Sequence, residues 1–191
     1  MANKKNIVRR IKSAVISVSD KSNLKPLLQT LNRYNVKLIS SGGTFKAIRK
    51  LGYRCLEVSD YTGFNEILDG RVKTLHPKIH AGILNKRNNN SHKREIKKNN
   101  FQNIDLVIVN FYPFEKTLNT TKNHNRIIEK IDIGGPALVR SAAKNYNDVA
   151  VITSTNQYSA LIDQLKRFKG ATKLEFRKKL SQSAFNETAY Y

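Results

Sequence analysis

The sequence predicts an α/β fold, with a doubly wound, mainly parallel sheet that carries helices on both faces. Two observations support this class: short β-branched runs alternate with amphipathic helical segments, and most of these runs are apolar on both faces. With 191 residues and 39% hydrophobic content, the chain is long enough to bury a sizeable core. We therefore expect residues 1–191 to form a single domain.

The first half of the chain is expected to contain two strand–turn–helix units. Residues 13–18 form a short apolar run typical of a buried strand, and leucines at 24, 27, 28 and 31 mark one face of the next helix. The unit repeats as a strand at 36–40 and a short helix at 45–51, which Gly52 ends. Weaker strands are expected at 54–58 and 81–84.

The second half continues the alternation. Residues 105–110 form the clearest central strand, and 148–153 form another. Helical patterns occupy residues 91–100, 126–130, 136–145, 157–168 and 173–190, the first of them within a basic surface excursion at 85–103. In such sheets ligands bind beyond the carboxyl ends of the strands, so the polar clusters found there are the candidate site.

Composition narrows the function. The 35 Lys and Arg against 14 Asp and Glu give a net charge of +21, but the basic residues are spread over helix surfaces and tails, which favours a solvated surface over nucleic-acid binding. Cys55 is the single cysteine, so an internal disulfide and a cysteine metal cage are excluded. No long apolar run or secretory signal is visible, so the default expectation is a cytoplasmic protein without a membrane partner.

Two clusters suit an anionic ligand. Ser41, Gly42, Gly43 and Thr44 lie between a predicted strand and helix, where backbone N–H groups can approach a phosphate, although Gly-Gly turns also occur for steric reasons alone. Residues 69–77 offer the Arg71 guanidinium, the Lys73 charge and a threonine hydroxyl, and the alternative is a basic turn on a basic protein. His76 and His80 are better explained by structural hydrogen bonds than by a metal pair.

Two further clusters adjoin predicted strands or helices. Asn110 and Tyr112 leave the clearest strand before a turn at Pro113, and Tyr112 either serves a ligand or packs as a core aromatic. Asp132 precedes a helix expected to begin at Pro136, where its carboxylate should stay ionised or act as a cap. Lys144 lies about 12 Å of helix rise beyond Pro136, and its reach depends on where the substrate lies.

Four strings in order resemble one family: Ser-Val-Ser-Asp-Lys (17–21), Ser-Gly-Gly-Thr (41–44), Gly-Arg-Val-Lys-Thr-Leu-His-Pro (70–77), and Ile-Asp-Ile-Gly-Gly-Pro-Ala-Leu (131–138) with Ala-Ala-Lys-Asn (142–145). From about residue 12 to 191 the chain resembles the N-terminal IMP cyclohydrolase domain of the bifunctional purine-synthesis enzyme that also carries AICAR formyltransferase. The resemblance implies a methylglyoxal-synthase-like fold and closure of 5-formamidoimidazole-4-carboxamide ribonucleotide to inosine 5′-monophosphate with loss of water. It implies no metal and no redox cofactor.

The resemblance also implies the site residues. Lys144 matches a proton-transferring lysine, while Lys73, Tyr112 and Asp132 match residues that polarise the formyl oxygen and orient the carboxamide. Residues that match the nucleotide-binding positions are Ser19, Asp20, Lys21, Ser41, Gly42, Gly43, Thr44, Arg71, Val72, Lys73 and Thr74, and those on the base side are Val109, Asn110, Asp132 and Ile133.

Family members continue into the formyltransferase domain and dimerise largely through it, so the chain is expected to be either a fragment or a stand-alone enzyme, with a homodimer possible. Two rival functions remain. A methylglyoxal synthase shares the architecture and a similar glycine turn, but would act on a triose phosphate and does not need the Lys-Thr-Leu-His-Pro string. A basic RNA-binding module is disfavoured because aromatic residues are not interleaved with the basic clusters.

Overall fold

A five-stranded parallel sheet forms the centre of the computed structural model, which describes residues 8–112 and 114–191. The strands lie in the order β4(Leu56–Glu57), β3(Lys37–Ser40), β2(Ser13–Val18), β5(Leu106–Asn110) and β6(Ala150–Ile152). In register, Val15 lies between Ile39 and Val107. The predicted fold class is confirmed.

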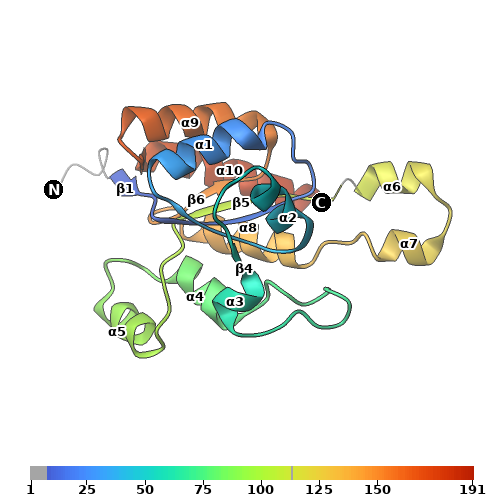
Figure 1. Cartoon of the computed structure of the whole chain (residues 1–191), viewed down its shortest axis with the longest axis horizontal. Coiled ribbons are helices and arrows are strands. Elements are labelled where there is room, and N and C mark those ends of the chain that lie inside the picture. Colours follow the sequence, from blue (N-terminus) through green and yellow to red (C-terminus); the bar gives the residue numbers. More distant parts are fainter. Residues whose placement is uncertain (1–7, 113) are drawn as a thin grey trace.

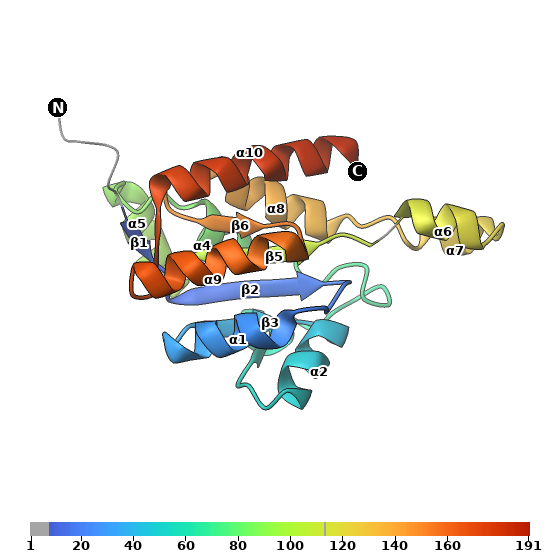
Figure 2. The ribbon, with the colours of Figure 1, turned by 90° about the horizontal axis from the view of Figure 1, so that it is seen from above.

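Helices cover the sheet on both faces (Figures 1 and 2). On one face α1(Leu24–Arg33) packs beside α9(Tyr158–Arg167), and on the other α4(Pro77–Leu84) packs beside α8(Gly134–Lys144). The long α10(Leu174–Tyr190) lies against α8 and β6. The predicted leucine face of α1 is buried as expected, with Leu27, Leu28 and Leu31 all at 0% exposure.

The remaining elements surround this core. A small antiparallel sheet joins β1(Val8–Arg10) to β7(Ala171–Lys173). The short helices are α2(Gly42–Lys50), α3(Val58–Thr62), α5(Asn90–Lys98) and η2(Thr155–Gln157). Every helix among the described residues is too short or too polar to cross a lipid bilayer.

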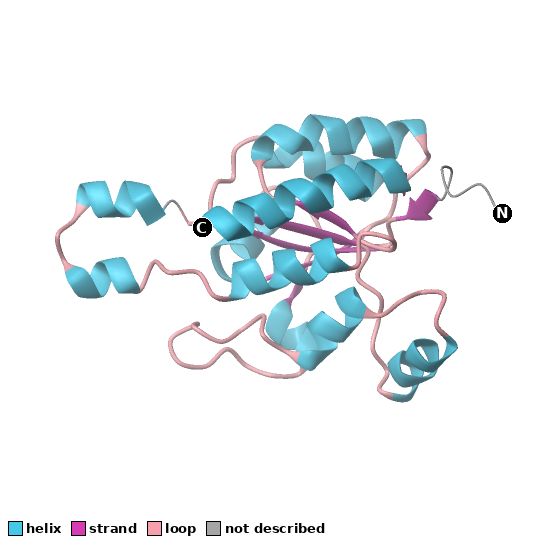
Figure 3. Cartoon of the chain, turned by 180° about the vertical axis from the view of Figure 1, so that it is seen from behind, coloured by secondary structure: helices cyan, strands magenta, loops and turns pink. Residues whose placement is uncertain are grey.

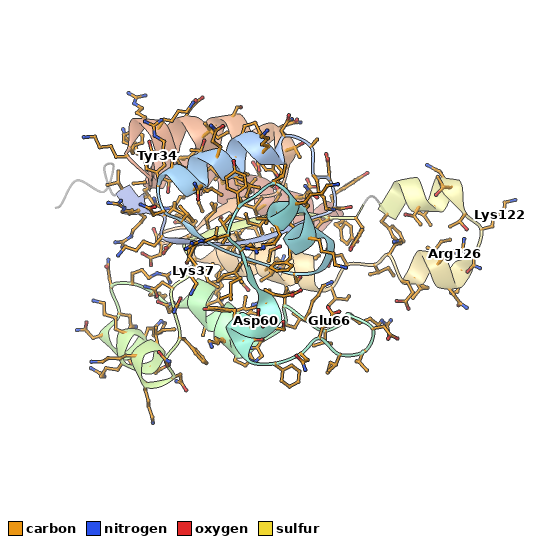
Figure 4. All side chains as sticks on the ribbon, viewed as in Figure 1. Tyr34, Lys37, Asp60, Glu66, Lys122 and Arg126 are labelled. Atoms are coloured by element: carbon orange, nitrogen blue, oxygen red, sulfur yellow. The ribbon has the colours of Figure 1, made fainter. Side chains whose placement is uncertain are left out.

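Two helices, α6(Phe114–Thr120) and α7(His124–Ile128), form an arm that projects from the body (Figure 3). Lys122 and Arg126 lie near its far end (Figure 4). The turn expected at Pro113 falls outside the described residues. The arm interrupts the chain between β5 and α8, and so separates two of the predicted clusters in sequence.

The predicted strand at 81–84 is wrong, because those residues form the last turn of α4. Pro77 occupies the first turn, where its missing N–H costs nothing, and Ile79 and Ile83 share one buried helix face. The expected strand at 54–58 shortens to two residues, and Val58 already begins α3. Helices α2 and α8 begin earlier than expected, at Gly42 and Gly134.

Candidate functional site

The candidate site lies at the carboxyl edge of the sheet, where β2, β3 and β5 end side by side. Polypeptide leaving β2 and β3 turns into α1 and α2, while polypeptide leaving β5 runs into the arm and then α8. The helices that follow these two neighbouring strands, α1 after β2 and α8 after β5, cover opposite faces of the sheet (Figure 1). This is the reversal point at which doubly wound sheets bind ligands.

The start of α2 provides an anion-binding turn. Ser41 is the extended N-cap, and Gly42 has φ +52°, a left-handed conformation that favours glycine. The first cap bond runs from the Phe45 amide to the Ser41 carbonyl, so the amides of Gly42, Gly43 and Thr44 have no acceptor within the helix. These N–H groups, with the helix dipole behind them, suit a phosphate.

Two residues predicted to touch the ligand, Asn110 and Thr44, make hydrogen bonds that shape the loop after β2. The Asn110 Oδ1 accepts from the amides of Ser19 at 2.7 Å and Asp20 at 2.9 Å, and its Nδ2 donates to the Asp20 carbonyl at 2.9 Å. The Thr44 hydroxyl donates to the Val18 carbonyl and accepts from the Val18 amide, both at 3.0 Å. Asn110 therefore ties the end of β5 to the loop after β2, and Thr44 ties α2 to the end of β2.

The loop after β2 also bonds within itself. The Lys21 Nζ donates to the Val18 carbonyl at 3.3 Å and the Ser19 carbonyl at 3.2 Å. The exposed Asp20 carboxylate accepts from the Ser22 amide at 2.8 Å, and this bond lowers the pKa of Asp20. Lys21 thus places its positive charge at the carboxyl end of β2.

Lys73 lies beside the α2 turn. A methyl group built at Gly42 would lie 3.7 Å from the Lys73 Nζ, and one built at Gly70 would lie 3.9 Å from it. Gly70 has φ +84°, so the tight turn that directs Lys73 requires a glycine. Two clusters 30 residues apart in sequence are thereby brought together, as the sequence predicted.

The same loop extends to the start of α8. Thr74 is buried, and its hydroxyl would lie 2.7 Å from a methyl group at Gly134. Arg71 is largely exposed, with its Nη2 3.6 Å from the Glu129 Oε1. Val72 forms an antiparallel backbone bridge with Ile67.

Asp132 completes this group. Its Oδ1 accepts from the Gly135 amide at 2.8 Å, and a side chain at Gly135 would overlap the carboxylate. Burial raises the pKa of Asp132, and the bond from Gly135 and the positive charge of Lys73 oppose that rise. Sequence reasoning considered only the helix start, which favours the ionised form, and missed the larger effect of burial.

Tyr112 is 45% exposed, and the Lys130 Nζ lies 5.4 Å from the centre of its ring. It is therefore a surface aromatic rather than a core residue. Ile133, the N-cap of α8, is 62% exposed, whereas Val109 is buried within β5. Of the residues expected on the base side, Asn110 and Asp132 are half-buried and Ile133 is exposed.

The structure does not bring Lys144 to this group. Lys144 is the last residue of the 11-residue α8, about 15 Å of helix rise beyond Gly134. Lys144 is exposed, and α8 begins at the carboxyl edge of the sheet and runs away from it (Figure 2). His76 and His80 make the hydrogen bonds that the sequence favoured: His76 Nδ1 accepts from the Lys78 amide, and His80 Nδ1 lies 3.0 Å from the Ser141 Oγ.

Two hollows lie among these residues. One of about 250 Å³ is lined by Ser41 and Lys73 together with Glu57, Phe64 and Glu66. Another of about 840 Å³ is lined by Ser19, Asp20, Asn110 and Tyr112, with Thr153 and Tyr191. Glu57, Thr153 and Tyr191 were missed from the sequence, because no local motif marks residues that only the fold brings to this edge.

Known proteins share both the sequence and the architecture. Residues 23–137 match the MGS-like domain family, and residues 142–191 match the AICARFT/IMPCHase bienzyme family. Proteins named bifunctional purine biosynthesis protein PurH from Bradyrhizobium diazoefficiens and Prochlorococcus marinus are 47% and 53% identical over 183 and 180 residues, or 96% and 93% of this chain. In both cases the chain spans 34% of the relative's length.

A solved structure titled "Crystal structure of ForH" superposes with a TM-score of 0.81 at 32% identity, covering 92% of both chains. The resemblance inferred from the motifs is thus confirmed by sequence matches, and the doubly wound architecture by a structural match. The chain belongs to the MGS-like domain family.

Proposed function

We propose that this chain is an IMP cyclohydrolase, which closes 5-formamidoimidazole-4-carboxamide ribonucleotide to inosine 5′-monophosphate with loss of water. The observation that carries the proposal is the position of Lys73, which lies beside the Gly42 turn and electrostatically stabilises the Asp132 carboxylate. A turn that suits a phosphate therefore lies near a cation and a carboxylate. The similarity to proteins named for purine biosynthesis supports a purine nucleotide as the ligand.

The 5′-phosphate is assigned to the start of α2. Free amides at Gly42 and Gly43 would donate to the phosphate oxygens, and the Ser41 hydroxyl adds a further donor. Arg71 is exposed and paired only loosely with Glu129, so its guanidinium can turn toward an anion. This leaves the heterocycle on the side of Asp132 and Tyr112.

The chemistry needs orientation more than strong reagents, because both reacting groups belong to one imidazole ring. The carboxamide nitrogen attacks the formyl carbon and loses one proton, the formamido nitrogen loses another as the new C=N bond forms, and the formyl oxygen takes up both and leaves as water. Lys73 would stabilise the negative charge that develops on that oxygen, and the Asp132 carboxyl would hold the carboxamide N–H and accept a proton. Tyr112 would orient the formyl group through its hydroxyl. No metal or redox cofactor enters the reaction.

Lys144 keeps its proton-transfer role as a prediction based on resemblance alone. Its place at the far end of α8 favours Lys73 and Asp132 as the groups that exchange protons with the substrate inside one chain. Replacing Lys144 with alanine separates the two assignments. Loss of turnover with retained nucleotide binding supports the resemblance, and full turnover assigns the chemistry to Lys73 and Asp132.

One observation weighs against the rival methylglyoxal synthase activity. The MGS-like match covers residues 23–137, but the remaining residues 142–191 match the bienzyme family rather than a synthase. We also propose that the chain works with an AICAR formyltransferase domain, either covalently attached or separate. A homodimer of the chain is proposed as well.

The test is to incubate purified chain with the formamido nucleotide and follow the ultraviolet change on ring closure. We expect inosine 5′-monophosphate to form, and Arg71→Ala to raise KM more than it lowers kcat. Arg33→Ala is the matched control, because Arg33 lies in the last turn of α1 away from the carboxyl edge. Conversion of dihydroxyacetone phosphate without ring closure would establish the synthase instead.

A further inference from the structure

The base of the α6–α7 arm consists of two stems, Phe111–Tyr112 before the arm and Lys130–Asp132 after it. These stems carry Tyr112 and Asp132, two of the proposed catalytic groups. One side chain from outside the arm, Tyr191, contacts both stems. It follows α10, about 60 residues away in sequence from the second stem and 80 from the first.

The Tyr191 hydroxyl both accepts and donates a hydrogen bond on the second stem. It accepts a hydrogen bond from the Asp132 amide at 2.9 Å and donates one to the Lys130 carbonyl at 3.3 Å. Such a pair fixes the backbone on both sides of Ile131. The carboxylate of Asp132 is held separately, by the Gly135 amide.

The Tyr191 ring contacts the first stem. Its centre lies 4.8 Å from that of Phe111 at an interplanar angle of 46°, which is a favourable tilted contact. Phe111 stands between Asn110, which ties the loop after β2, and Tyr112. Tyr191 therefore holds the two stems together from the end of α10, and we call these contacts the clasp. The Lys130–Tyr112 cation–π contact also joins the two stems.

The Tyr191 hydroxyl also interacts electrostatically with Asp132, one of the proposed catalytic groups. Burial raises its pKa, the hydrogen bond from the Asp132 amide opposes that rise, and the negative charge of the Asp132 carboxylate adds to it. The hydroxyl thus keeps its proton at neutral pH and can go on donating to Lys130. A phenylalanine at this position would keep the ring contact and lose both hydrogen bonds.

We propose that Tyr191 is a positioning residue for the ring closure, fixing the Asp132 backbone through its hydroxyl and the Tyr112 stem through its ring. This inference rests on the proposed function for the reaction it serves, but the clasp itself is independent of any activity. It assigns a role to the residue that follows α10, which belongs to none of the motifs that resemble the family.

The first arm of the test measures the clasp without turnover. Amide hydrogen exchange at Asp132 is followed by NMR in the wild-type chain, in Tyr191→Phe and in the control Tyr34→Phe, whose tyrosine lies far from the arm (Figure 4). We expect exchange at Asp132 to become at least about tenfold faster in Tyr191→Phe and to stay unchanged in the control. Unchanged exchange in Tyr191→Phe overturns the clasp.

The second arm measures ring closure. We expect kcat of Tyr191→Phe to fall about tenfold while KM stays within about twofold, because the phosphate turn at Gly42 is not touched. A merely structural role would leave the kcat of the folded variant unchanged, and that result overturns the positioning role. A wild-type chain that does not close the ring overturns the proposed function itself, a failure that the exchange arm leaves distinguishable.

Discussion

The two edges of the central sheet differ in whether their charged groups are buried and paired. At the amino edge, charged groups are buried and paired: the Asp148 carboxylate meets the Arg9 guanidinium at 2.8 Å and accepts from the Arg87 amide, and the Arg87 guanidinium lies 3.6 Å from Asp105. At the carboxyl edge, Lys73, Arg71 and the first amides of α2 have at most weak protein partners.

Arg177 shows how completely the amino edge is closed. It is fully buried, and it donates to the carbonyls of Tyr146, Asn147 and Thr172. Burial lowers the pKa of Arg177 to about 10, which is still well above neutral pH. Because the Arg177 guanidinium donates to carbonyl groups inside the fold, it holds these segments together and is not accessible to a ligand.

The comparison teaches that charge alone does not locate a site in this very basic chain. Lysine and arginine occur at both edges, and what differs is whether the fold supplies their partners. Among the described residues, basic side chains without a buried acidic partner lie near a carboxylate with a raised pKa at the carboxyl edge, where function is proposed. Substitutions at the two edges should therefore affect different measurements.

The largest expected effect is on the free energy of unfolding at the amino edge. Asp148→Ala leaves Arg9 without its buried partner and should cost roughly 3–5 kcal/mol. Glu129→Ala is the matched control at the carboxyl edge, where the pair with Arg71 is exposed and should be worth less than about 1 kcal/mol. Urea unfolding measures both, and equal losses would refute the contrast between the edges.

The second largest effect is expected from alanine substitutions at two glycines, one near each edge. A methyl group at Gly82, near the amino edge, would lie 2.6 Å from the Gln102 carbonyl oxygen, so Gly82→Ala should cost about 1–3 kcal/mol of stability. A methyl group at Gly135 meets the Asp132 carboxylate instead, so Gly135→Ala should mainly lower kcat. Thermal melts and initial rates on both variants check this division, which fails if the two variants behave alike.

The third effect concerns protonation at the carboxyl edge. Burial raises the pKa of Asp132, so its stabilising contribution is full below the ordinary carboxyl pKa of about 3.9 and is lost as pH rises through the higher folded value. Lys73 opposes that shift, and Lys73→Met should move the pKa of Asp132 further upward. A carboxyl NMR titration measures this, with Lys37→Met as the control; a downward shift would contradict the proximity of the two groups.

The smallest effect concerns Cys55, which directly precedes β4, the outermost strand of the sheet. Burial raises the pKa of the Cys55 thiol to about 12, so very little thiolate exists at pH 8. Native protein should react with iodoacetamide far more slowly than unfolded protein, and Cys55→Ser should leave ring closure unchanged. Rapid labelling of the native chain would show that this region opens easily.

Much of the fold follows from local pattern. The apolar run at 13–18 forms a strand with those same bounds, since β-branched residues on both faces leave few alternatives. The pattern failed at 81–84, where four apolar or small residues suit a strand or a helix end equally well. Only the tertiary contacts of Ile79 and Ile83 decide between them.

The site was predicted less completely than the fold. Glycine-rich and basic strings identified Gly42 and Lys73, because those residue types suit an anion wherever they occur together. The ties made by Asn110 and Thr44 could not be foreseen, since an amide or hydroxyl looks the same in sequence whether it binds a ligand or a backbone. Tyr191 has no local signal at all.

The turn after β2 receives its shape from Thr44 and Asn110, which lie 26 and 91 residues from the amides that they bind. A chain emerging during synthesis cannot present this turn correctly until residue 110 has been made and β5 has docked beside β2. Nucleotide affinity should therefore appear late and all at once during folding, and a bound nucleotide should protect the whole sheet against global unfolding rather than one loop.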